Sequence, residues 1–177
     1  MDGTRWLDSQ EHRAWRSYLA ATRLLASQLD RELQRDSQIP HTYYEILVQL
    51  SEAPNRSLRM SDLADASESS RSRLSHAVSR LEKNGWVRRE ICPTDRRGAF
   101  AILTDDGFAA LKNAAPAHVE SVRTHLFDRL TQEQVGQLTA ICDSITEGLR
   151  EQTDGLREQD ALPDSPDHAH DVCQEAS

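Results

Sequence analysis

Several side chains between residues 69 and 80 could bond base edges and phosphates if they share one face of a helix. On a helical wheel of about 100° per residue, the polar residues gather opposite an apolar set. The polar side includes Ser69, Ser72, Arg73, His76, Ser79 and Arg80, and the apolar side includes Leu74, Ala77, Val78 and Leu81. Arginine can donate two hydrogen bonds to guanine O6 and N7, and serine can bond bases or phosphates. The wheel alone is equally compatible with a solvated surface.

A second candidate group lies in the basic, turn-rich segment 92–98, between two segments with strand character, 86–91 and 99–103. Arg96 and Arg97 precede Gly98 near the tip of this loop, which suits the minor groove or the DNA backbone. Arg88 and Arg89 flank the loop and could meet phosphates. Asp95 is either a turn residue or a carboxylate that orients Arg97 across the loop.

The elements that must position these residues are mostly helices. Apolar periodicity predicts helices over 10–36, 41–51 and about 132–150, and a further helix from the Thr104 cap toward residue 130. Between them we expect a short helix over 62–66 with Ser61 as its N-cap, a helix over 68–84, and a hairpin. The fold class is therefore mainly α with a small β-hairpin wing, namely a winged helix-turn-helix plus a helical region.

The distribution of charge decides how the net charge of −8 is interpreted. Residues 55–100 carry ten basic and six acidic side chains, whereas residues 151–177 carry eight acids and one arginine. The acidic excess therefore belongs largely to the C-terminal tail, which has the composition of a disordered segment from about residue 153. A net acidic chain does not argue against a basic, DNA-facing domain.

The sequence also carries motifs of a known family. Gly85-Trp86-Val87-Arg88-Arg89, Asp95-Arg96-Arg97-Gly98 and Leu103-Thr104-Asp105-Asp106-Gly107 resemble the MarR family of bacterial transcription regulators. Leu58-Arg59-Met60-Ser61-Asp62-Leu63-Ala64 and Ser72-Arg73-Leu74-Ser75-His76 match as well. The resemblance covers roughly residues 10–150 and leaves out the acidic tail.

The resemblance implies a homodimer whose outer helices interlock and whose winged domains bind a pseudo-palindromic DNA operator, with helix 68–84 in the major groove and wing 92–98 on the minor groove or backbone. It implies a repressor, and often release by a small phenol or aromatic acid. We therefore expect dimerisation and support from residues 1–52 and 105–152, and DNA binding from residues 53–104. The candidate DNA contacts are Ser69, Ser70, Ser72, Arg73, His76, Arg80, Arg88, Arg89, Asp95, Arg96 and Arg97.

An aromatic cluster with one histidine could hold such a planar anion. Its candidates are Trp15, Tyr18, His41, Tyr43 and Tyr44, which could equally form a dimer interface or core. Redox sensing through Cys92, at the base of the wing, is an alternative, as is a winged-helix module that binds proteins instead of DNA.

Other classes of protein are not supported by the sequence. It has no nucleophile, phosphate-loop or metal-ligand motif, so we expect no enzyme activity, no cofactor and no metal. His168, His170 and Cys173 match no structural zinc spacing. Three widely spaced cysteines, no signal peptide and no long apolar run predict a cytoplasmic protein without a membrane partner.

Overall fold

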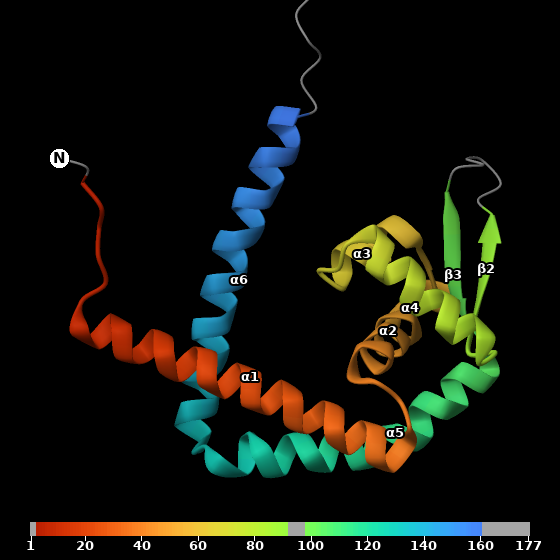
Figure 1. The fold of residues 1–177 in the computed structure, drawn as a ribbon, viewed down its shortest axis with the longest axis horizontal. Helices are drawn as coiled ribbons and strands as arrows, with labels where there is room; N and C mark the ends of the chain where they lie inside the picture. The colour runs from red at the N-terminus through yellow and green to blue at the C-terminus, as the bar shows by residue number, and fades with distance from the viewer. Residues whose placement is uncertain (1–2, 92–97, 161–177) are drawn as a thin grey trace, which may run out of the picture. The chain divides into compact units, whose positions relative to one another are not determined.

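The fold begins with a long helix that has a defined start and end (Figure 1). In this computed structural model, which describes residues 3–91 and 98–160 and side chains up to residue 152, α1 spans Ser9–Ser37. Asp8 and Glu11 form a capping box, with Asp8 Oδ1 accepting from the Glu11 amide at 2.8 Å. Gln38, in a left-handed conformation (φ 58°), ends the helix. The predicted helix over 10–36 is confirmed within one residue at each end.

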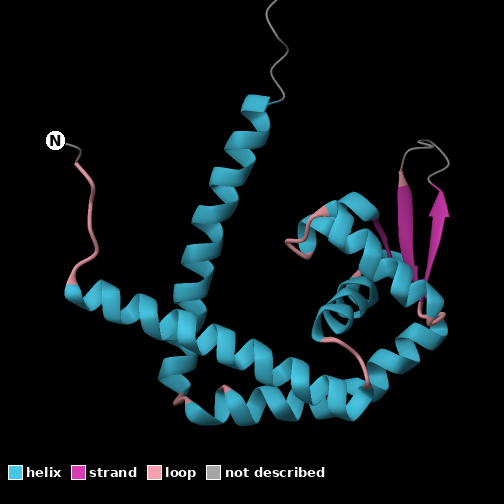
Figure 2. Cartoon of the chain, in the orientation of Figure 1, coloured by secondary structure: helices cyan, strands magenta, loops and turns pink. Residues whose placement is uncertain are grey.

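The next elements form the winged helix-turn-helix. α2 (His41–Glu52), a short 3₁₀ turn (Pro54–Arg56) and β1 (Ser57–Arg59) lead into α3 (Met60–Ala66) and α4 (Arg71–Lys83). β2 (Val87–Ile91) and β3 (Ala99–Leu103) then form the predicted hairpin strands. The strands, magenta in Figure 2, form one sheet. Its order is β1-β3-β2, antiparallel throughout, with Ser57 opposite Ile102 and Val87 opposite Leu103.

Two details around β1 and α3 differ from the sequence-based expectation. β1 was not predicted, because a three-residue edge strand is too short to show alternation. Ser61 is not the N-cap of α3: the helix begins at Met60, Arg59 occupies the cap position, and the Ser61 hydroxyl donates to Asp62.

The core of this domain is built from side chains of α2, α3, α4 and the sheet. The most deeply buried include Leu47, Leu50, Leu63, Val78, Leu81 and Ala101, each fully inaccessible to solvent. Together they hold α4 against α2 and the sheet, so the orientation of α4 is set by apolar packing.

α5 (Asp105–His125) is attached closely to the end of α4. Thr104 accepts from the Gly107 amide at 3.0 Å, as predicted for the cap, and donates to Gly85 O at 2.7 Å. A Cβ at Gly107 would stand 2.1 Å from Trp86 O, so only glycine allows this approach. The helix ends at His125 and a 3₁₀ turn, Phe127–Arg129, follows, so the predicted run toward residue 130 is broken at Leu126. α5 packs along α1.

The chain divides into two compact units, residues 1–129 and 130–177, and the second is described by itself. It contains α6 (Gln132–Asp160). Thr131 and Gln134 form the predicted capping box at 2.9 and 3.2 Å. α6 extends ten residues beyond the predicted end, so the expected tail boundary near residue 153 falls inside a helix. Residues 161–177 lie outside the described part of the chain.

Candidate nucleic-acid interface

α4 has one buried and one solvent-facing side, as the helical wheel predicted. Leu74, Ala77, Val78 and Leu81 are buried in the core, whereas Ser72, Arg73, His76 and Arg80 are exposed. Ser79 is half-buried and donates to Ser75 O at 2.9 Å. The exposed set lies along one side of a helix whose opposite side is fixed by packing, so its side chains are presented outward from a rigid support.

The start of α4 corrects the expected range of 68–84. The helix begins at Arg71, because Glu68 has a left-handed φ of 47° and Ser69 N bonds back to Ala64 O at 3.0 Å. Ser70 is the N-cap and accepts from the Arg73 amide at 3.3 Å. Ser69 and Ser70 therefore belong to the turn before the helix.

The end of α4 follows the sequence signal at Asn84-Gly85. Gly85 has φ 74° and its amide bonds Glu82 O at 2.9 Å, while the Trp86 amide bonds Leu81 O at 3.0 Å. This pair of bonds is a Schellman motif, which ends the helix and directs the chain into β2.

Arg88 and Arg89 are neighbours on β2 but have different surroundings. Arg89 Nη2 donates to Ser75 O at 2.7 Å and to Ser79 Oγ at 3.1 Å. Its Nε lies 3.4 Å from the Glu82 carboxylate. Arg88 is exposed and pairs with Glu90 along its own strand. The Arg89 guanidinium, which we expected to meet phosphates, thus joins β2 to α4 within the domain.

The candidates at the tip of the wing lie outside the described residues. They are Asp95, Arg96 and Arg97, and the redox alternative at Cys92 falls in the same segment. Their roles remain predictions.

The aromatic candidates fall into separate groups. Trp15 and Tyr18 stack on each other on the exposed part of α1, with ring centroids 6.1 Å apart. His41 and Tyr44 both meet His118 of α5, at 5.5 and 4.5 Å between ring centroids. Tyr43 is half-buried and lines a surface hollow with Arg73, His76 and Arg80.

His118 therefore belongs to the same group as His41 and Tyr44, although it was not among the residues that the sequence suggested. Its Nδ1 is buried without a hydrogen-bond partner. Burial, and then the charge of His41, lower the pKa of His118 below its ordinary 6.5, and burial raises the pKa of Tyr44. His118 follows Leu111 and Ala114 at helical spacing, and this pattern could have indicated that His118 faces inward.

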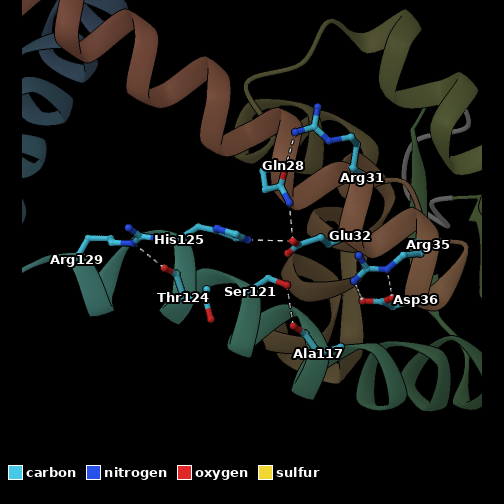
Figure 3. Close-up of polar contacts among 10 residues, drawn as sticks. All are labelled: Gln28, Arg31, Glu32, Arg35, Asp36, Ala117, Ser121, Thr124, His125 and Arg129. Carbon is cyan, nitrogen blue, oxygen red and sulfur yellow. Dashed lines mark hydrogen bonds and ion pairs between the residues drawn. The ribbon is translucent and has the colours of Figure 1, made fainter.

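A polar cluster joins α1 to α5 next to this site (Figure 3). Glu32 lies 2.9 Å from His125 Nε2 and accepts from Gln28 Nε2 at 2.6 Å. Hydrogen bonding by Ser121, then His125 and Gln28, lowers the pKa of Glu32 to about 2. The Ser121 hydroxyl donates to Ala117 O at 3.0 Å. Glu32 and His125 are 93 residues apart in the chain, so sequence spacing does not reveal this pair.

The described residues contain no group of three or more histidine, cysteine or acidic side chains placed to hold a metal ion. No helix within 3–91 or 98–160 is long and apolar enough to cross a membrane.

Comparisons with known proteins agree with this geometry. A family model of the MarR family matches residues 39–98. The crystal structure of Sco3205, a MarR family transcriptional regulator from Streptomyces coelicolor in complex with DNA, is 56% identical. It superposes with a TM-score of 0.80 over 84% of this chain and 93% of that one.

Two characterised relatives are more distant. The transcriptional repressor MprA of Escherichia coli is 30% identical over 124 residues, which are 70% of this chain and 67% of MprA. The HTH-type transcriptional regulator PecS of Dickeya dadantii is 32% identical over 89 residues, which are 50% of this chain and 53% of PecS. The match thus spans about half the length of PecS.

Proposed function

The chain belongs to the MarR family of transcription regulators, and from that premise we propose that it is a homodimeric repressor that binds a pseudo-palindromic operator. α4 enters the major groove, and the wing over 92–98 reaches the minor groove or the backbone. The observation that carries this proposal is the exposed row of Ser72, Arg73 and His76, continued by Arg80, opposite a fully packed apolar face. The DNA complex of the 56% identical Sco3205 supports it.

Dimerisation is supported by apolar side chains that each unit leaves exposed. On α6, Ile141, Ile145 and Leu149 recur every four residues and are all exposed. On α1, the side chains of Trp15 and Leu19 are exposed as well. Such rows match the subunit contact expected of residues 1–52 and 105–152. A two-fold dimer places its recognition helices about one turn of DNA, roughly 10 base pairs, apart.

The ligand-release part of the proposal is supported by the His41, Tyr44 and His118 group. A buried ring nitrogen without a partner, next to a tyrosine, is a polar group that a small phenol or aromatic acid could satisfy. We place the effector there, with Trp15, Tyr18 and Tyr43 outside this group of contacting rings.

The test is fluorescence anisotropy with a labelled duplex from the region upstream of the protein's own gene. Arg73→Ala is expected to weaken operator binding by about 1–3 kcal/mol and to relax discrimination between operator and scrambled DNA. Arg97→Ala should chiefly weaken binding to both. Arg13→Ala, which is exposed on the side of α1 away from Trp15, is the control for a lost positive charge.

If Arg73→Ala and Arg97→Ala both leave operator affinity unchanged, the proposed binding mode is wrong. If the wild-type protein shows no salt-dependent binding to any duplex, the protein-interaction alternative is favoured instead.

A further inference from the structure

We propose that a phosphodiester of the bound duplex lies in a hollow beside α4, held by Arg59 and Arg71, neither of which belongs to the outward row of α4. This inference rests on the DNA-binding function proposed above. The hollow has a volume of about 440 Å³ and lies among β1, the first turn of α3, α4, β2 and the start of β3. The polar residues among the described part of its lining are Arg59, Ser61, Arg71, Ser75 and Arg89.

The charge of this lining favours an anion. Three arginines, from β1, α4 and β2, line one concave surface together with two serines. Among the described residues that line it, none is acidic. Arginine stays protonated at any physiological pH and presents a planar set of donors that matches phosphate oxygens. A phosphate is therefore the ligand chemistry that this surface fits.

The three arginines are held in different ways, which gives the hollow a fixed shape. Arg89 is bound to Ser75 O and pairs with Glu82, so it contributes charge from a set position. Arg59 is half-buried on β1, and its guanidinium lies over the Phe100 ring, 5.4 Å from the centroid. Arg71 is exposed at the rim, where a ligand can reach it.

The position of Arg71 is a second, independent observation. It is the first residue of α4, and the first turn of this helix contains no acidic side chain. A cation at a helix N-terminus opposes the helix dipole, whereas an anion there is stabilised. A phosphate in the hollow would face the positive end of α4 and the Arg71 guanidinium together, which turns an unfavourable placement into a favourable one.

The exposed row of α4 and the hollow therefore have different roles in DNA binding. The exposed row of α4 reads bases, and the hollow anchors the backbone on the wing side of that helix, which fixes the depth and angle of α4 in the groove. Losing the anchor should therefore weaken binding to all sequences equally.

The experiment measures binding of the full chain to two duplexes of about 30 base pairs across a range of salt. One duplex is recovered by selection from genomic fragments and the other is scrambled. Arg71→Gln and Arg59→Gln are each expected to lower the slope of log K against log salt by up to about 1.8 for both duplexes, because each subunit of the dimer loses a contact that contributes about 0.9. Arg13→Gln removes an exposed arginine of α1, on the side away from Trp15, and should retain the wild-type slope.

Thermal unfolding checks that the variants fold. Arg59 is part of β1 and packs on Phe100 of β3, so its replacement could affect folding. The exposed Arg71 is therefore the decisive position. If Arg71→Gln keeps the slope of Arg13→Gln while the wild-type protein binds DNA in a salt-dependent way, the hollow is not a phosphate anchor, although the DNA-binding function stands. If no duplex binds the wild-type protein, both proposals fail.

A calorimetric titration with inorganic phosphate separates the two sources of this anion. We expect no saturable binding at matched ionic strength, because the duplex supplies the phosphate together with its neighbouring contacts. Phosphate binding that both variants lose, with an unchanged DNA slope, would assign the hollow to a free anion and overturn the proposal.

Discussion

At the scale of single residues, Arg88 and Arg89 are chemically identical neighbours with opposite surroundings. Alternation along β2 puts Arg89 on the side of Val87, which is buried, and Arg88 on the other side. The sequence contains this alternation, so the inward position of Arg89 could have been predicted from Val87. Its partners could not, because Ser75 and Ser79 meet it only through the packing of β2 on α4.

Replacing each arginine by glutamine should separate their roles. Arg89→Gln removes charge-assisted hydrogen bonds to α4 and leaves Glu82 without its cation, so we expect about 1–3 kcal/mol less free energy of unfolding in urea. Arg88→Gln loses only an exposed ion pair and should change stability by less than about 1 kcal/mol. Equal stability of the two variants would contradict the bracing role of Arg89.

At the scale of elements, the helices with strong caps and apolar periodicity and the two hairpin strands were predictable, whereas β1 and the 3₁₀ turns were not. Thr104 and the Thr131–Gln134 box mark helix starts that the structure confirms. The start of α4 was placed three residues early, because the left-handed Glu68 is set by packing against α3 and not by residue type. The contact of Glu32 with His125 and the contacts of His118 with α2 depend on tertiary packing, which periodicity alone does not specify.

The α2–α5 junction should make stability depend on pH through His118. Its pKa in the folded protein lies below 6.5, because burial and His41 disfavour the protonated ring. Its contribution to stability is therefore complete above pH 6.5 and is lost as the pH falls toward the folded pKa, because the unfolded chain binds the proton first. One such proton changes the free energy of unfolding by at most about 1.4 kcal/mol per pH unit.

His118→Phe keeps an aromatic ring beside Tyr44 but cannot titrate. Urea unfolding between pH 7.5 and 5 should show a shallower loss of stability below pH 6.5 for this variant than for wild type. His12→Phe, an exposed histidine of α1, is the control. A wild-type pH dependence in His118→Phe would show that other groups at the junction, namely His41 and Glu45 of α2, Glu32 and Asp36 of α1 or His125 of α5, account for it.

At the scale of the whole molecule, the net charge of −8 does not reveal the small basic surface around α4. The helical wheel indicated which side of this helix carries the outward arginines, and Arg73 and Arg80 of α4 are exposed there. The hollow at Arg59 and Arg71 was not predictable, because its lining comes from five elements, of which β1 was not anticipated. Surfaces assembled from distant segments require the fold itself.

The last prediction concerns assembly, which the exposed row Ile141, Ile145 and Leu149 of α6 suggests. Ile145→Asp would place a charge in the proposed interface, where it would be buried without a partner, so we expect a monomer. Sedimentation velocity should give the 20.0 kDa chain mass for this variant and twice that mass for wild type.

Ala140→Asp adds the same charge to the same helix, about half a turn away from Ile145 and also exposed, so it should remain dimeric. The monomer would bind one half-site without the second, and a linked pair of sites gains about 10²–10⁴ in affinity over one. Ile145→Asp should therefore lose operator affinity by a factor in this range, while its affinity for an isolated half-site stays near that of wild type. A dimeric Ile145→Asp, or a monomer with full operator affinity, would show that α6 does not build the DNA-binding dimer.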